Sequence, residues 1–535
     1  MPTAKHSLLF LAIMAATASL SAGDPTAPPD VILLPEGEQP PEHLRDENRE
    51  FQGIPGIDGA ANGRLWATWY GGGQGEDANN VVMLATSGDD GATWSEIRVI
   101  VDADEPVRCF DPVVWVDPRD RLWLFWGQAI THGINAHTWA MVTENPGDSH
   151  PEWREPFIIG PGVMMNKPTV TENGEWHLPI SDWEGRRLRT EGAATSGTVV
   201  SRDEGKTFEA LGAAYVPVEH RQYDEQMLVE RSDGSLLMWV RTRYGIGESV
   251  SNDGGVTWSE LTPSEVKHPV ARFFIRKLQS DNLLLVKHGP LDEQIGRSHL
   301  TAFVSRDEGK TWEGGLVLED RQCSYPDGFQ ADDGTIRIIY DRSRRGDKEI
   351  LMAAFTEEDA LAGRPVTDRV RKRVLVNQAT GDSYRDIAAS IEFRENNDGE
   401  ELLTGNPAQW RIQDDDSVEK LELNATLFND RDYRLAQLPE ELEGMRFIKS
   451  SLRSTKAVCT QDGVVYVLTP SDGRNNHSLH DELLKNGFTK ATVPEFLLFA
   501  HSTGAANACS TYQKQVSSGE TLEFGPWGVI VMPEG

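Results

Sequence analysis

Short runs in which apolar and polar residues alternate recur along the first two thirds of the chain. Such runs occupy residues 65–70, 122–126, 236–240 and 336–340, each after a Gly or Asp turn. Alternation with a period of two is typical of strands that bury one face, and turn residues at both ends limit each strand to a few residues. The pattern therefore predicts an all-β fold built from many short strands.

An eight-residue motif, S-x-D-x-G-x-T-[WF], occurs four times between these runs. The copies span residues 87–94, 201–208, 251–258 and 305–312. In such a motif the Asp hydrogen-bonds its own backbone, the Gly supplies a positive φ, and the aromatic residue returns between adjacent sheets. The motif thus predicts a structural turn and carries no chemistry of its own.

The spacing of the motif predicts a repeat architecture. Its final aromatic residues stand at 94, 208, 258 and 312, so the first interval is close to twice the others. Trp153, which follows a Gly/Asp turn, supplies the missing register. A unit of about 50 residues with about four strands is one propeller blade. A sixth blade fits between Tyr325 and Phe355, and we expect an N-terminal strand near 31–34 to complete it. The prediction is a six-bladed β-propeller over residues 30–365.

Residues 375–535 lack the motif and predict a second domain. Polar, acidic stretches around 395–401 and 414–416 are typical of a linker or of a loop-rich entry to a second domain. Strand-like runs and one short helix candidate follow, at residues 463–468, 495–500, 528–532 and 479–485. We expect a small β-rich, sandwich-like domain that binds carbohydrate or packs against the propeller. Cys459 and Cys509 could pair within it.

The first 23 residues have the pattern of a secretory signal. Lys5 and His6 precede an apolar run from Leu8 to Leu20, and small residues follow at 21–23. This run is shorter than the roughly 20 residues that a spanning helix needs, and no later run approaches that length. We therefore expect a secreted or periplasmic protein without a membrane span.

Charge and motif content exclude several classes of function. The formal net charge of −32 argues against a nucleic-acid partner, because phosphate binding needs clustered Lys and Arg. The sequence contains no H-E-x-x-H, no Cys/His ligand spacing, no G-x-S-x-G and no nucleotide-binding glycine loop. We expect neither a metal nor a cofactor.

Four copies of S-x-D-x-G-x-T-[WF] at blade spacing resemble the Asp boxes of the sialidase superfamily, over roughly residues 45–360. The resemblance implies a propeller, but Asp boxes lie on the rim and accompany unrelated activities. Sialidases use a tyrosine nucleophile activated by a glutamate, an acidic residue as acid/base, and three arginines that grip the substrate carboxylate.

Three residues match the reacting groups of that family. Tyr325, in S-Y-P-D-G ahead of a D-G-T-I strand, resembles the nucleophile, with an ordinary buried tyrosine as the alternative. Glu225, in Y-D-E-Q ahead of a D-G-S-L strand, resembles the activating glutamate, the base that a neutral phenol needs. Glu76 stands in the glycine-rich loop 71–77, where the family has its acid/base; Asp77 competes with it, and a solvated acidic turn is the alternative.

The arginines depart from the family pattern. Where sialidases read F-R-I-P, this chain reads F-Q-G-I-P at residues 51–55, and the second arginine would fall near Ile246, with Arg241 close by. Arg297 matches the third. Because bidentate carboxylate recognition depends on planar guanidinium groups, these differences bear directly on whether sialic acid is the substrate.

Other cationic residues could contribute to a binding site. Arg108, Lys167 and Arg272 each precede a strand by a few residues, where inner strands of a propeller face the central funnel. An ordinary surface position without substrate contact is the alternative for each. As a set in an acidic chain they indicate an anionic or polyhydroxylated ligand.

The leading hypothesis is an exo-acting, retaining glycosidase for sialic acid or another acidic or deoxy sugar. A propeller that binds glycans without cleaving them is the first alternative. A propeller polysaccharide lyase that uses His and Tyr is the second.

Overall fold

The structure is a computed structural model. It describes residues 23–73, 75–130, 134–183, 195–381, 399–413, 416–423, 425–431, 433–471, 478–500 and 505–533. The expected secretory signal falls almost entirely on residues 1–22, outside the described residues. Within the described ranges, no helix is both long enough and apolar enough to cross a membrane.

Six antiparallel sheets follow one another between residues 30 and 378, which confirms the all-β prediction. The strands of the first three sheets are β2 (Gln52–Gly59), β3 (Leu65–Gly71), β4 (Val81–Ser87), β5 (Val99–Asp102) and β1 (Asp30–Leu33); β6 (Val107–Val116), β7 (Leu122–Ile130), β8 (Ile134–Thr143) and β9 (Phe157–Pro161); and β10 (Val163–Met164), β11 (Thr169–Val170), β12 (Trp176–Ser181), β13 (Ser196–Ser201) and β14 (Glu209–Ala214).

The strands of the other three sheets are β15 (Arg221–Glu230), β16 (Leu236–Thr242), β17 (Gly245–Ser251) and β18 (Thr262–Pro263); β19 (Phe274–Lys277), β20 (Leu283–His288), β21 (Leu300–Ser305) and β22 (Glu313–Glu319); and β23 (Ser324–Gln330), β24 (Ile336–Arg342), β25 (Glu349–Phe355) and β26 (Arg371–Gln378). A short helix, α2 (Glu357–Ala362), lies between β25 and β26, and a 3-10 turn, Glu42–Leu44, precedes β2.

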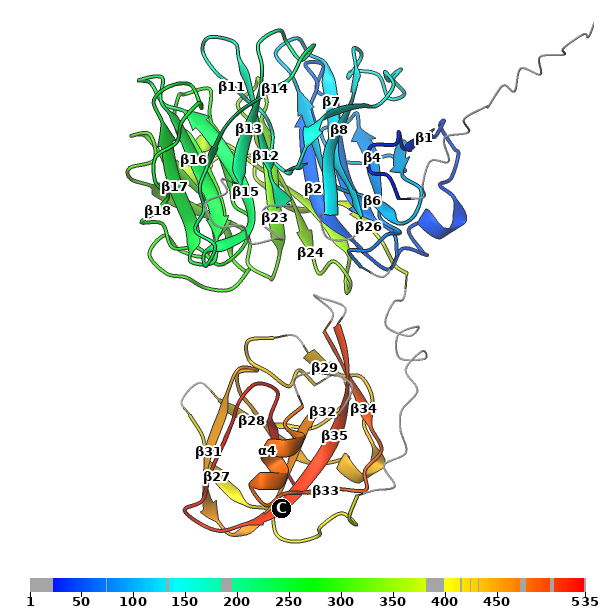
Figure 1. The fold of residues 1–535 in the computed structure, drawn as a ribbon, viewed down its shortest axis with the longest axis vertical. Coiled ribbons are helices and arrows are strands. Elements are labelled where there is room, and N and C mark those ends of the chain that lie inside the picture. Colours follow the sequence, from blue (N-terminus) through cyan, green and yellow to red (C-terminus); the bar gives the residue numbers. More distant parts are fainter. Residues whose placement is uncertain are drawn as a thin grey trace, which may run out of the picture.

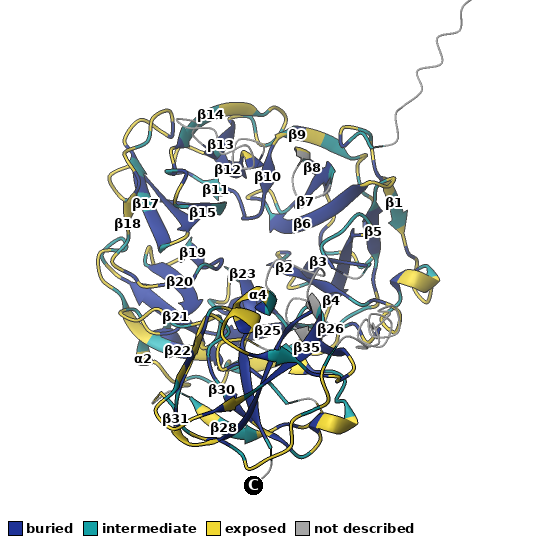
Figure 2. Cartoon of the chain, turned by 60° about the horizontal axis from the view of Figure 1, so that its bottom comes forward, coloured by how far each residue is buried: buried dark blue, intermediate teal, exposed yellow. Residues whose placement is uncertain are grey.

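Figure 2 shows these sheets arranged around a common centre, with β2, β6, β15, β19 and β23 nearest to it. The strands nearest the centre contact those of neighbouring sheets: β2 contacts both β6 and β23, and β19 contacts both β15 and β23. The first sheet is therefore a neighbour of the last one, and the inner strands surround one central space.

Aromatic residues of the turn motif pack between neighbouring sheets. Phe208, at the end of one motif, lies 6.3 Å from Trp123 of the preceding sheet in an edge-on contact. Trp312 contacts Trp239 of its preceding sheet at 5.7 Å. Trp153, the residue proposed for the missing register, meets Trp66 edge-on at 6.4 Å. Because such contacts bury large apolar rings, they hold adjacent sheets together.

The hydrogen bonds of the motif explain its spacing. Each copy lies between the last two strands of its sheet in chain order. In the first copy, Asp89 accepts hydrogen bonds from the backbone N–H and the hydroxyl of Thr93, at 2.9 and 2.6 Å. Gly91 has a φ of 76°, which side chains disfavour. Hydrogen bonds from Thr93 lower the pKa of Asp89 to about 2. The motif is structural, as the sequence indicates.

The prediction for the N-terminal strand is wrong. β1 pairs with β5, with Val31 opposite Val101, so it extends the first sheet and not the last. The last sheet obtains its outer strand from β26, which pairs with β25. The chain reaches β26 through α2, which begins with a capping box between Thr356 and Asp359 in place of an Asp turn. Since β26 is already the outer strand of the sixth sheet, β1 is not needed to complete that sheet.

Residues 409–532 form two further sheets (Figure 1, yellow to red). The smaller sheet contains β27 (Gln409–Arg411), β31 (Thr455–Gln461) and β36 (Thr521–Phe524). The larger contains β28 (Ser417–Lys420), β30 (Arg446–Lys449), β37 (Val529–Met532), β32 (Gly463–Pro470), β35 (Ala505–Val516), β34 (Phe496–Ala500), β29 (Tyr433–Leu435) and β33 (Thr489–Lys490). A 3-10 turn, Glu440–Leu442, and α4 (His480–Lys485) complete it.

The strand β32 shows how this region is held together. Its residues alternate between two separate apolar clusters, with Val464 and Tyr466 in one and Val465 and Val467 in the other. The larger sheet is therefore covered on both faces along β32. The structure confirms the strands expected around 463–468, 495–500 and 528–532, and the helix expected at 479–485.

The cysteines do not pair. All four lie within described residues and are buried free thiols. Cys459 belongs to β31 in the smaller sheet and Cys509 to β35 in the larger, and each joins a different apolar cluster. The disulfide considered from the sequence is therefore absent.

Candidate active site

A cavity of about 170 Å³ contains most of the residues that the sequence singles out. It is lined by Ile54, Tyr70, Glu76, Arg108, Phe110, Asp111, Met165, Trp183, Tyr223, Glu225, Arg241, Arg297, Tyr325 and Arg344. Six of the eight candidate site residues are among them. The sheets thus bring together residues that are up to 249 positions apart, from Glu76 to Tyr325.

Four of the lining residues occupy the same position on four inner strands. Ile54, Asp111, Glu225 and Tyr325 each begin a β-bulge, in which two residues oppose one residue of the neighbouring strand. Their φ angles are 54°, 49°, 47° and 55°. A bulge re-aims a side chain, and each left-handed non-glycine residue costs on the order of 1–3 kcal/mol. Backbone strain is therefore present at these four positions, whose side chains line the cavity.

The sequence carries a local signal for three of these bulges. Proline follows Ile54, Asp111 and Tyr325 directly. Proline has no N–H to leave unpaired where the bulge interrupts the ladder of hydrogen bonds. A proline at the start of an inner strand would therefore have identified Asp111, which sequence reasoning missed.

Tyr325, Glu225 and Arg241 form a buried hydrogen-bonded group. The Tyr325 hydroxyl donates to Glu225 Oε1 at 3.4 Å, and Arg241 Nη1 donates to the same oxygen at 2.5 Å. Arg241 Nη1 also lies 3.3 Å from the Tyr325 hydroxyl. Burial, followed by the nearby Glu225 carboxylate, raises the pKa of Tyr325 to about 12 against the opposing effect of three arginines. The phenol is thus neutral at neutral pH, with a carboxylate placed beside its proton.

The cavity is rich in guanidinium groups. Arg108, Arg241, Arg297 and Arg344 line it together with the carboxyl groups of Glu76, Asp111 and Glu225. The guanidinium carbons of Arg297 and Arg344 lie 6.0 and 5.3 Å from the centroid of the Tyr325 ring. Four positive groups against three carboxyls give this cavity a positive balance within a chain of net charge −32. Such a balance favours an anionic ligand.

Arg344 is a cavity residue that sequence reasoning missed. It lies in the turn between β24 and β25, and its Nη1 donates to Glu76 Oε1 at 2.6 Å. Its side chain passes beside Gly53, where an added Cβ would overlap the Arg344 stem. Gly53 belongs to the F-Q-G-I-P segment, in which the arginine of the family pattern is missing. Arg344 therefore brings a guanidinium to that place from a different sheet, which no local motif could indicate.

The two acidic candidates of the glycine-rich loop differ. Glu76 lines the cavity, whereas Asp77 does not, and Asp77 accepts a hydrogen bond from the backbone of Asn79 at 3.0 Å. Gln74 of this loop lies outside the described residues.

Lys167 and Arg272, expected as ligand-binding residues, do not line the cavity. Lys167 Nζ donates to Ile57 O, to Val114 O and to Asp327 Oδ2, at 2.7, 2.8 and 2.7 Å. Arg272 Nη2 lies 3.6 Å from Asp327 Oδ1. Asp327, far away in the sequence, thus pairs directly with Lys167 and lies within 4 Å of Arg272. This buried cluster joins the inner strands β2, β6 and β23, and the structure thereby corrects the expected role of both residues.

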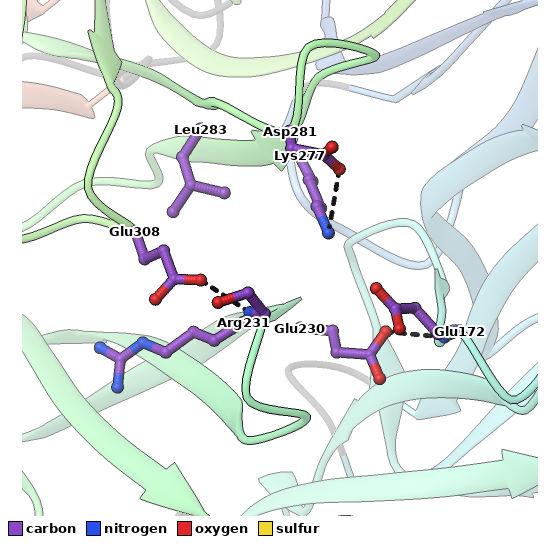
Figure 3. Close-up of a pocket in the computed structure, with 8 residues that line it drawn as sticks. Glu172, Glu230, Arg231, Lys277, Asp281, Leu283 and Glu308 are labelled. Atoms are coloured by element: carbon purple, nitrogen blue, oxygen red, sulfur yellow. Dashed lines mark hydrogen bonds and ion pairs between the residues drawn. The ribbon is translucent and has the colours of Figure 1, made fainter.

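A second pocket, about 160 Å³, lies between neighbouring sheets and contains none of the candidate residues (Figure 3). Glu230 accepts a hydrogen bond from the backbone of Glu172 at 2.7 Å, and Lys277 pairs with Asp281 at 3.3 Å. Glu308 likewise accepts from the backbone of Ser232. These carboxylates serve contacts between sheets. Within the described part of the chain, no group of three His, Cys, Asp or Glu residues is arranged to hold a metal.

Comparisons with known proteins agree with this architecture. Residues 63–338 match the family model described as the BNR repeat-like domain. The sialidase of Micromonospora viridifaciens is 25% identical over 337 residues, covering 54% of this chain and 49% of that protein. The sialidase of Bacteroides fragilis is 24% identical over 354 residues, covering 56% of this chain and 62% of that protein.

The aligned regions span about half to three fifths of the length of these curated relatives. Among solved structures, the intramolecular trans-sialidase from Ruminococcus gnavus in complex with oseltamivir carboxylate is 15% identical, with a TM-score of 0.47; the match covers 58% of this chain and 95% of that one. The family model covers more than half of the chain and includes all four copies of the turn motif. The chain belongs to the BNR repeat-like domain family, within the sialidase superfamily.

Proposed function

We propose that this protein is a glycoside hydrolase that releases an anionic sugar from the end of a glycan and retains the anomeric configuration. One observation carries the proposal. The Tyr325 hydroxyl, Glu225 and Arg241 form one hydrogen-bonded group at the wall of a cavity with four guanidinium groups. A neutral phenol suits an anionic substrate, because it avoids the repulsion that a carboxylate nucleophile would meet.

In the proposed first step, Tyr325 attacks the anomeric carbon and Glu225 takes the phenolic proton. The bond to the leaving oxygen breaks, and a cavity carboxylic acid protonates that oxygen. The family resemblance assigns this acid to Glu76. In the second step, water attacks the same carbon, the acid/base takes a proton from the water, and Tyr325 leaves and recovers its proton from Glu225.

Glu225 is suited to the role of base. Its Oε1 faces the phenol, and its Oε2 is buried and has no hydrogen-bond partner among the described residues. The phenolic proton would therefore pass to Oε1, the oxygen that Arg241 also contacts. Arg241, at 2.5 Å, holds the group in place.

The arginines around Tyr325 indicate the class of substrate. Arg241, Arg297 and Arg344 surround the Tyr325 ring from three different sheets. Planar guanidinium groups bind carboxylates in bidentate fashion. Sialic acid and other acidic sugars are therefore the first substrates to test, followed by deoxy sugars.

We further propose that the six sheets are the six blades of a β-propeller spanning about residues 30–378. The contact between β2 and β23, which joins the first and last sheets, supports this closure. Residues 399–533 would then form a β-rich accessory domain. The signal pattern in residues 1–23 supports export, so the protein would be secreted or periplasmic.

A glycan-binding propeller without catalysis is the alternative that one observation favours. The strand β2 has Ile54 at the bulge position where three other inner strands have Asp, Glu and Tyr, and it lacks the family arginine. A lyase is less well supported, because no histidine is found among the described residues that line the cavity.

The test is release of reducing sugar from a panel of sialosides, uronides and deoxy-sugar glycosides. Wild type is compared with Tyr325→Phe, which removes only the hydroxyl, and with Tyr215→Phe, a matched change at an exposed tyrosine. We expect turnover of at least one anionic glycoside by wild type and Tyr215→Phe, and its loss in folded Tyr325→Phe. Glycan binding without any turnover would refute the hydrolase proposal.

A further inference from the structure

The two acidic groups of the cavity that could protonate a leaving oxygen have opposite surroundings. Glu76 Oε1 lies 2.6 Å from Arg344 Nη1, and its side chain is 32% exposed. An ion pair with access to solvent favours the carboxylate form, which has no proton to donate. Asp111 is only 2% exposed. Its Oδ1 is buried and has no hydrogen-bond partner in the described parts of the chain.

The backbone places Asp111 where it places the other reacting groups. Asp111 begins the bulge of β6 with a φ of 49°, as Glu225 does in β15 and Tyr325 in β23. All three side chains line the same cavity. The strained conformation recurs at Ile54 of β2, but Asp111 adds a buried carboxyl oxygen without a hydrogen-bond partner, a cost that the stability of the fold alone does not require.

The charged groups that face Asp111 come from several elements. Arg108, on the same strand, and Arg272, ahead of β19, favour its charged form; Glu76 and Glu225 oppose it. Tyr70 on β3 also faces Asp111, and burial keeps that phenol neutral by raising its pKa well above the ordinary value. Burial is the largest influence on Asp111, and the net effect raises its pKa to about 7. Asp111 thus exchanges its proton readily near neutral pH, as an acid/base must.

We propose that Asp111 is the acid/base of the reaction, and that Glu76, through its ion pair with Arg344, acts as a positioning residue for that arginine. This inference rests on the proposed hydrolase function. It reassigns the acid/base from the carboxylate that the family resemblance suggests to one that the bulge of β6 presents.

As the Tyr325 oxygen bonds to the anomeric carbon, the electron pair of the breaking C–O bond passes to the leaving oxygen, which takes the proton of Asp111. Glu225 receives the phenolic proton. In the second step the Asp111 carboxylate takes a proton from the attacking water, and Tyr325 recovers its proton from Glu225. Both carboxylates and the phenol return to their starting states.

The first test uses two glycosides of the sugar that wild type turns over: one with a saccharide leaving group, which needs a proton, and one with an acidic phenol, which does not. For Asp111→Asn we expect kcat/KM to fall about 10²- to 10⁴-fold on the first and less than about tenfold on the second. The alkaline limb of the pH profile, expected near pH 7 in wild type, should disappear.

Glu76→Gln should behave differently. Because it loosens Arg344, we expect KM to rise by a similar factor on both glycosides. The alkaline limb should be retained but move to lower pH, since Glu76 no longer raises the pKa of Asp111. A leaving-group-dependent loss in Glu76→Gln, together with an equal loss on both glycosides in Asp111→Asn, would overturn the assignment.

A second measurement does not depend on activity. Infrared difference spectra between pH 6 and 8 report the protonation of carboxylic acids. Burial raises the pKa of Asp341 to about 6, so this carboxyl contributes a second band at the acid end of the range. We expect a component that titrates near pH 7 in wild type and in Asp281→Asn, whose side chain is exposed, and the loss of that component alone in Asp111→Asn. No difference between the variants would overturn the proposal. If wild type cleaves no glycoside, the hydrolase function fails, and these spectra still decide whether Asp111 carries the proton.

Discussion

Replacing Lys167 by Met should destabilise the ring of inner strands strongly. Lys167 and its main partner, Asp327, are both 2% exposed, and the Lys167 ammonium makes three hydrogen bonds to three other strands. Methionine fills a similar volume and removes the charge, so the change isolates the electrostatic contribution.

The size of the loss in stability depends on the carboxylates that stay buried without Lys167. Asp327 would keep a hydrogen bond from Ile57 N at 3.0 Å and Arg272 at 3.6 Å, while Asp58 would lose its nearest cation. Removing one partner of a buried ion pair costs about 3–5 kcal/mol. We therefore expect the free energy of unfolding to fall by about that amount.

Urea denaturation followed by tryptophan fluorescence measures this change, because all of the 15 tryptophans except Trp410 and Trp527 lie in the region of the six sheets. Lys277→Met is the matched control. Its pair with Asp281 is at the surface, and such pairs contribute about 0–1 kcal/mol. The double variant Lys167→Met/Asp327→Asn should recover part of the loss. A Lys167→Met protein as stable as Lys277→Met would refute the reasoning.

Three further predictions concern the cavity and the turns. Gly53→Ala should displace Arg344 and weaken the binding of an acidic sugar about tenfold, as measured by calorimetry. Gly160→Ala is the control, because a Cβ added there meets no atom within 4 Å. Equal affinities of the two variants would contradict the placement of Arg344. The pKa of Asp111 is raised from 3.8 to about 7, so the folded state binds a proton that the unfolded state has released. The free energy of unfolding of wild type, relative to Asp111→Asn, should therefore fall by up to about 4 kcal/mol as pH rises from 4 to 7. Urea midpoints that change in parallel for the two proteins would exclude this. The pKa of Asp89 is lowered to about 2, so its stabilising effect is present above pH 4 and is lost as pH falls toward 2; Asp89→Asn should therefore reduce the acid sensitivity of the fluorescence, and an unchanged acid transition would argue against it.

The fold could be predicted from the sequence where its causes are local. The Asp turn depends on hydrogen bonds within five residues, so its repeats gave the sheet boundaries directly. Closure of the last sheet depends on β26, whose polar sequence and preceding helix α2 carry no repeat. The N-terminal strand was misplaced for that reason.

The site was predicted only as far as the family motif reaches. Tyr325, Glu225, Glu76 and Arg297 were found by resemblance, and the structure brings them to one cavity. Asp111 depends on a bulge register, and Arg344 on a contact between sheets. Arg344 leaves no signal in the residue types alone, whereas the proline after Asp111 marks its bulge.

The assignments of Lys167 and Arg272 failed for a related reason. Both stand at the start of inner strands, as a ligand-binding cation would. Their partner, Asp327, is 160 residues away from Lys167 in the sequence. Whether a buried cation faces a ligand or a carboxylate is decided by tertiary contacts of this range.

The central claim is that Tyr325 forms a covalent bond to the sugar. A fluorinated, activated analogue of the glycoside that wild type cleaves should accumulate this intermediate, and mass spectrometry of the digested protein locates it. The account predicts one equivalent of sugar on the peptide that contains Tyr325, and none in Tyr325→Phe. Label on another residue, or full turnover by Tyr325→Phe, would contradict it.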